Sequence, residues 1–209
     1  QQQRVAIARA VAINPIALLL DEPFSNLDRI LARELRKDIK KIVTNTETTT
    51  ILVTHDREEA LAISDRVAVV SNSKLLQIDT PEYIYNNPIT PDVASLVGPC
   101  DFIDGEYKNN SVETSFGKFR AKSIEKIDDH QNVKVLIRPS DIHLNNEGSE
   151  NFSNRVISRE YRGEYEEYEI LSEKGEIIHS RMNNYENIAV DSKVQIILNK
   201  NRSVIVYKN

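Results

Sequence analysis

Two short apolar runs, each ending abruptly in polar residues, constrain the fold of the first half of this chain. The run Ile16–Leu20 ends in Asp21–Glu22, and the run Thr50–Thr54 ends in His55. Runs of this length and composition, bounded by such residues, are typical of β-strands with buried faces. Because helical spacing fills the chain between them, we expect neighbouring parallel strands in an α/β domain.

Helical patterns surround the two runs. Residues 2–13 predict an amphipathic helix that ends before Asn14–Pro15, because the residue before a proline disfavours helical geometry. Asp28 is expected to cap a helix that runs to about Thr44. The basic face of that helix is interpreted as solvated surface, and it comprises Arg33, Arg36, Lys37, Lys40 and Lys41. A short helix over 57–63 and strands over 66–70 and 74–79 complete the pattern.

The polar residues after the two runs suggest chemistry at the strand ends. An isolated Asp21–Glu22 pair is usually a pair of surface carboxylates, and a lone histidine is usually structural. Ser25 and Asp28 are also good turn and cap residues. The ordered series of Asp21–Glu22, Ser25, Asp28 and His55 is more specific than any member. Adjacent carboxylates at a strand end also suit Mg²⁺, which prefers oxygen ligands.

In this order the residues resemble the ATP-binding subunit of ABC transporters. Gln1–Ala10 looks like the tail of the signature motif, and Asp21–Pro23 is similar to the Walker B segment. Ser25–Asp28 is similar to the D-loop, although Asn26 departs from the alanine common there, and His55 is similar to the switch histidine. The resemblance covers residues 1–97, which are expected to be the C-terminal part of a P-loop NTPase domain.

The resemblance implies a role for each of these residues. Asp21 is expected to hold Mg²⁺, usually through water, and Glu22 to polarise the water that attacks ATP. His55 is expected to contact the γ-phosphate. The resemblance further implies nucleotide-binding roles for Gln1, Ser25 and Asp28, with Gln1 as the remnant of the signature loop.

The sequence contains no Gly-x-x-x-x-Gly-Lys-Ser/Thr, the loop whose backbone N–H groups and lysine cradle phosphates. The chain also opens inside the signature motif. We therefore interpret it as the C-terminal portion of a longer polypeptide, inactive towards ATP without the rest.

From Pro81 two short helices punctuated by prolines are expected, and after Pro99 the pattern becomes strand-rich. Residues 98–209 resemble the OB-like β-barrel called TOBE, on the evidence of Val135–Ile142 and Tyr161–Gly163. The stretch 161–169 mixes tyrosines with glutamates and is expected to be a strand with mixed faces. Nine strands are expected, over 102–107, 111–115, 117–121, 132–137, 155–161, 165–171, 177–182, 193–198 and 203–207.

Composition limits the partners. A net charge of −5 gives no electrostatic reason to expect nucleic acid or an anionic surface, and no run approaches the roughly 18 apolar residues of a membrane span. Cys100, the sole cysteine, cannot form an internal disulfide and is interpreted as a small apolar thiol.

The resemblance implies a subunit of an importer of polyamine, sulfate, iron(III) or sugar type, located peripherally at the cytoplasmic face of the cell membrane. The partners it implies are a second ATPase subunit, permease subunits and, indirectly, a solute-binding protein. Two alternatives stay open: a soluble ABC-type ATPase, and a regulatory fragment whose barrel binds a small anion.

Overall fold

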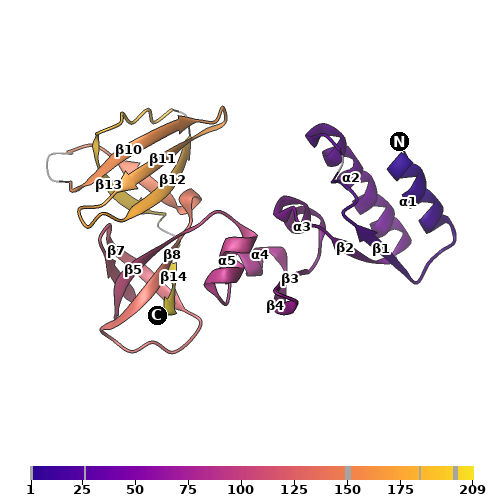
Figure 1. The fold of residues 1–209 in the computed structure, drawn as a ribbon, viewed down its shortest axis with the longest axis horizontal. Coiled ribbons are helices and arrows are strands. Elements are labelled where there is room, and N and C mark those ends of the chain that lie inside the picture. Colours follow the sequence, from indigo (N-terminus) through magenta and orange to yellow (C-terminus); the bar gives the residue numbers. More distant parts are fainter. Residues whose placement is uncertain (1, 26, 149–151, 184, 200–201) are drawn as a thin grey trace. The chain divides into compact units, whose positions relative to one another are not determined.

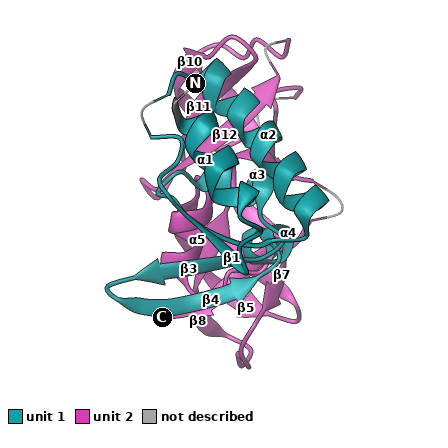
Figure 2. Ribbon diagram, turned by 90° about the vertical axis from the view of Figure 1, so that its right-hand side faces the viewer, with its two compact units in different colours: residues 1–86 teal, residues 87–209 magenta. Residues whose placement is uncertain are grey.

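The computed structural model divides into two compact units, Gln1–Asn86 and Asn87–Asn209 (Figure 2). It describes all residues except 1, 26, 149–151, 184 and 200–201. The two compact units meet between residues 86 and 87, whereas the sequence predicts that the ATPase part ends at residue 97 and the TOBE-like part begins at residue 98. That predicted boundary between functional domains stays a prediction.

Unit 1 alternates helices with strands (Figure 1). Its β1 and β2 form a parallel pair in which Ala17 lies opposite Thr49 and Asp21 opposite Val53, as expected for an α/β domain. β3 and β4 form a separate antiparallel hairpin. The elements are α1 (Gln2–Ala12), β1 (Ala17–Asp21), α2 (Arg29–Thr46), β2 (Thr49–Val53), α3 (Arg57–Ile63), β3 (Val67–Ser71), β4 (Lys74–Asp79) and α4 (Pro81–Asn86).

The core of unit 1 lies between β1 and the helices α1 and α2. Side chains of β1 alternate, so that Leu18 and Leu20 are buried whereas Leu19 is 72% exposed. The helices contribute Ile7, Ala32, Leu35 and Ile39, and Phe24 joins them. This packing holds the carboxyl end of β1 firmly beside α1.

Unit 2 begins with α5 (Pro91–Val97) and continues almost entirely in strands. Five of them close into a barrel of order β14-β7-β6-β5-β8, and the others form a sheet of order β12-β11-β10-β13-β9. The strands are β5 (Asp101–Lys108), β6 (Ser111–Thr114), β7 (Gly117–Ser123), β8 (Gln131–Ile137), β9 (Ile142–Asn145), β10 (Asn154–Tyr161), β11 (Tyr165–Leu171), β12 (Ile177–Asn183), β13 (Lys193–Leu198) and β14 (Val204–Lys208).

The expected barrel is therefore present, but it accounts for only half of the strands. β14 closes it by pairing in parallel with β7 and antiparallel with β8. β9 was not expected from the sequence; its four residues follow directly after the 3₁₀ turn Pro139–Asp141. The other nine strands lie within two residues of their expected bounds.

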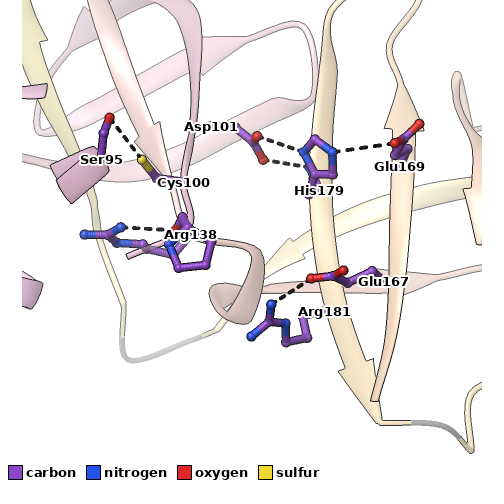
Figure 3. Close-up of polar contacts among 9 residues, drawn as sticks. Ser95, Cys100, Asp101, Arg138, Glu167, Glu169, His179 and Arg181 are labelled. Carbon is purple, nitrogen blue, oxygen red and sulfur yellow. Dashed lines mark hydrogen bonds and ion pairs between the residues drawn. The ribbon is translucent and has the colours of Figure 1, made fainter. Parts of the chain in front are cut away.

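Polar side chains join the parts of unit 2 (Figure 3). The buried Arg138 donates from Nη1 to the carbonyl oxygens of Ala94, Gly98 and Pro99 at 3.0, 2.9 and 3.1 Å, which ties the end of α5 to the barrel. The carboxylate of Asp101 on β5 accepts from the backbone N–H of His179 at 2.7 Å, and its other oxygen lies 2.8 Å from Nδ1 of that histidine on β12. The barrel and the second sheet are thus linked through the side chain of Asp101.

Candidate functional site

The carboxyl ends of β1 and β2 bring the expected catalytic residues together. Asp21 lies opposite Val53, and the Glu22 backbone N–H donates to the Val53 carbonyl oxygen at 2.8 Å. Because the strands are parallel and in register, the residues that follow each strand emerge at the same edge. His55 follows two positions after Val53 and therefore reaches Glu22 across that edge.

Glu22 and His55 are in direct contact. Nδ1 of His55 lies 2.9 Å from Oε1 of Glu22, although the two residues are 33 positions apart. Both side chains are open to solvent, with 75% of His55 and 46% of Glu22 exposed. Glu22 has a backbone φ of 42°, a left-handed conformation that is uncommon for a residue with a side chain. The chain thus turns sharply out of β1 at the residue expected to act on water.

The segment after His55 is held by its own hydrogen bonds. The Asp56 carboxylate caps α3 by accepting from the N–H groups of Glu58 and Glu59 at 2.8 and 3.3 Å. The Thr54 hydroxyl donates to the Glu59 carboxylate at 2.7 Å and accepts from the Asp56 N–H at 3.0 Å. His55 therefore lies in a turn that is anchored on both sides, which limits the positions of its imidazole.

Ser25 and Asp28 take part in local structure. The Ser25 hydroxyl donates to the Glu22 carbonyl oxygen at 3.0 Å, and Asp28 caps α2 by accepting from Ile30 N–H and Leu31 N–H, each at 3.0 Å. These are the turn and cap roles that both residue types commonly play. Their nucleotide-binding roles stay predictions, and Gln1, like Asn26, lies outside the described residues.

An open pocket of about 550 Å³ adjoins the strand end. Asp21, Glu22 and Ser25 line it together with residues of α1. His55 borders this site through its contact with Glu22, whereas Asp28 is not among the lining residues. The sequence analysis did not single out the α1 residues Gln3, Ala6 and Ile7, yet their spacing of three and four places them on one helical face.

The described residues contain no group of three or more histidine, cysteine, aspartate or glutamate side chains that could hold a metal. This is compatible with Mg²⁺, which is usually held by one or two carboxylates together with water and substrate phosphates. Asp21 is exposed at the mouth of the pocket and offers such a carboxylate.

The carboxylate of Glu22 raises the pKa of His55 above 6.5, chiefly through their hydrogen bond and then through its charge. We expect Glu22→Gln to lower this pKa towards 6.5, since the amide removes the negative charge that favours the imidazolium form. NMR titration of the His55 imidazole in the 209-residue chain measures the change.

Glu164→Gln is the matched control, because it makes the same chemical change on an exposed residue of unit 2. This control substitution should leave the pKa of His55 unchanged. An unchanged His55 pKa in Glu22→Gln would show that the two side chains do not interact in solution.

Within the described ranges, we find no helix with both the length and the apolar character needed to span a membrane.

Comparison with known proteins gives long matches. The spermidine/putrescine import ATP-binding protein PotA of Borrelia garinii subsp. bavariensis is 41% identical over 83% of this chain and 50% of its own length. That of Mesoplasma florum is 34% identical over 100% of this chain and 59% of its own. The sulfate/thiosulfate import ATP-binding protein CysA of Acinetobacter baylyi is 35% identical over 77% of this chain and 45% of its own length. The chain spans about half the length of the curated relatives it matches.

The fold and the strand-end site together define the C-terminal part of an ABC-type ATP-binding protein, followed by a β-rich domain. The TOBE domain family matches residues 135–206 of that second part. The chain belongs to the family of ABC importer ATP-binding proteins of the PotA and CysA type, and it corresponds to their C-terminal portion with its TOBE domain.

Proposed function

We propose that the whole protein hydrolyses ATP and couples this reaction to solute import. The observation that carries the proposal is the contact between the Glu22 carboxylate and the His55 imidazole beside Asp21 and an open pocket. Its relatives are named as import ATP-binding proteins, which supports the same reading.

In this proposal the strand-end residues divide the work. Glu22 orients and polarises the water that attacks the γ-phosphate, and His55 contacts that phosphate while its bond to Glu22 fixes the carboxylate. Asp21 would hold Mg²⁺ through water, and the ion, when bound, would neutralise charge on the phosphate oxygens. Ser25, Asp28 and Gln1 would complete nucleotide binding.

The partners follow from the same family. We infer a second ATPase subunit and permease subunits, with a solute-binding protein acting through the permease, at the cytoplasmic face of the membrane. The names of the relatives point to a polyamine or to sulfate as the solute. The TOBE domain would extend the dimer contact or sense solute.

We further propose that the 209-residue chain has no ATPase activity of its own, because its sequence contains no phosphate-binding loop. A protein extended at its N-terminus to the length of its relatives should hydrolyse ATP, while the 209-residue chain at equal concentration should stay at the background rate. A phosphate-release assay with Mg²⁺ measures both. Turnover by the short chain at the level of the longer protein would refute this proposal.

A further inference from the structure

One face of α2, which we call the cationic face, has no part in the proposed ATPase chemistry. It consists of Arg29, Arg33, Lys37, Lys40 and Lys41. Its members are exposed in the structure, and at 3.6 residues per turn they cover about 120° of the helix surface. None of them forms an ion pair with another described residue.

The two acidic residues of α2 do not neutralise this face, because the helix carries six cationic side chains and both acids pair with an arginine of another helix. Arg4 of α1 lies 3.4 Å from the carboxylate of Glu34 and 3.1 Å from that of Asp38. α1 and α2 run side by side (Figure 1), and these two ion pairs join them. α2 therefore keeps a net positive charge beside these pairs, although the whole chain carries a net charge of −5.

An apolar side chain lies within the cationic face. Ile30 is 74% exposed in the first turn of α2, and its neighbours at i+3 and i+4 on the helix surface are Arg33 of the cationic face and Glu34. α2 has no aromatic residue on which a nucleic-acid base could stack. A row of cations that begins beside an exposed isoleucine suits the interface of an anionic bilayer, which accepts both charge and a shallow apolar insertion.

We propose that the cationic face of α2 binds the surface of an anionic phospholipid membrane. The sequence suggested a solvated basic face that included Arg36 in place of Arg29. In the structure the cations of α2 outnumber its two acids, and both acids pair with Arg4. Electrostatic attraction acts over about 10 Å at ordinary salt, so the local charge of α2 matters more than the net charge of the chain. This binding is independent of ATP and of the proposed catalytic residues.

Co-sedimentation of the 209-residue chain with phosphatidylglycerol-containing vesicles tests the proposal. Each cation near an anionic surface contributes about a fivefold increase in partitioning, so Arg33→Gln, Lys37→Gln and Lys41→Gln together should lower it roughly 100-fold. Added salt should weaken the binding of the unaltered chain. Ile30→Ser should reduce binding at every salt concentration and leave the salt dependence unchanged.

The matched control makes the same change in net charge on unit 2, through Lys108→Gln, Lys126→Gln and Lys174→Gln. These lysines are exposed, and the triple variant should bind vesicles like the unaltered chain. Circular dichroism checks that each variant stays folded. Equal binding of both triple variants, or equal binding to pure phosphatidylcholine, would overturn the proposal. So would tighter binding of single-stranded RNA than of vesicles through the same α2 residues.

Discussion

In a version of the protein extended to the length of its relatives, Glu22→Gln is expected to lower ATP turnover by roughly 100-fold or more while nucleotide stays bound. A general base commonly increases the rate of a reaction about 10²- to 10⁴-fold, and an amide cannot take the proton of the attacking water. Binding should persist because the amide keeps the size of the carboxylate and removes one negative charge beside the triphosphate. Steady-state turnover and equilibrium nucleotide binding separate the two effects.

Two further variants sharpen this result. Glu164→Gln makes the same chemical change on an exposed residue of unit 2 and should keep the turnover of the unaltered protein. Asp21→Asn should shift the Mg²⁺ concentration for half-maximal turnover upwards, since a neutral amide is a poorer partner for a hydrated cation. Undiminished hydrolysis by Glu22→Gln would reject the assignment of Glu22, whatever its effect on the pKa of His55.

The strand-end site could be predicted because its determinants are local. An apolar run followed by Asp21–Glu22, and another followed by His55, each indicate a strand and its end, and parallel pairing aligns the two ends. The contribution of α1 to the pocket was not predicted. It depends on how Ile7 packs against β1, which is a tertiary contact that helical periodicity does not specify.

The division of unit 2 into a barrel and a separate sheet was also beyond the sequence analysis. β14 lies more than 60 residues after both of its neighbours, β7 and β8, and pairing over such distances leaves no local pattern. β9 has only four residues, too few for alternation to stand out. Of the stretch 161–169, which was expected to be one strand with mixed faces, residues 165–169 lie in β11, which alternates buried and half-buried positions, whereas 162–164 connect β10 to β11. That Glu166 points to the buried side was not expected.

The burial of Glu166 leads to the largest expected effect on stability. Its side chain is 1% exposed and its carboxylate accepts from the Arg159 guanidinium, with Nε at 3.1 Å, and from the Tyr168 hydroxyl. Arg159 holds the pKa of Glu166 below 4.5, and burial together with Glu166 raises the pKa of Tyr168 to about 12. Arg159 itself is 31% exposed, whereas Glu166 is buried, so removing Arg159 leaves the buried carboxylate without a compensating charge.

We therefore expect Arg159→Ala to lower the free energy of unfolding of unit 2, and by more than the loss of a surface ion pair does, because Glu166 stays buried without its cation. Arg155→Ala is the matched control on the same strand, since Arg155 pairs at 3.2 Å with Asp191 where the side chains are 50% and 75% exposed. Such a surface pair contributes about 1 kcal/mol or less to the free energy of unfolding. Urea unfolding followed by tyrosine fluorescence reports mainly on unit 2, because only Tyr83 and Tyr85 of the 8 tyrosines lie in unit 1.

The dependence of this effect on pH distinguishes an ion pair from simple packing. Because the folded pKa of Glu166 lies below its ordinary value of 4.5, its stabilising contribution is present above pH 4.5 and is lost as the pH falls through the folded pKa. The difference between the unaltered chain and Arg159→Ala should accordingly shrink in acid. Arg159→Met combined with Glu166→Gln removes both charges and keeps an acceptor for Tyr168, so it should recover much of the lost stability. A loss that persists undiminished in acid, or in this double variant, would mean that the packing of the Arg159 side chain, rather than its charge, stabilises the sheet.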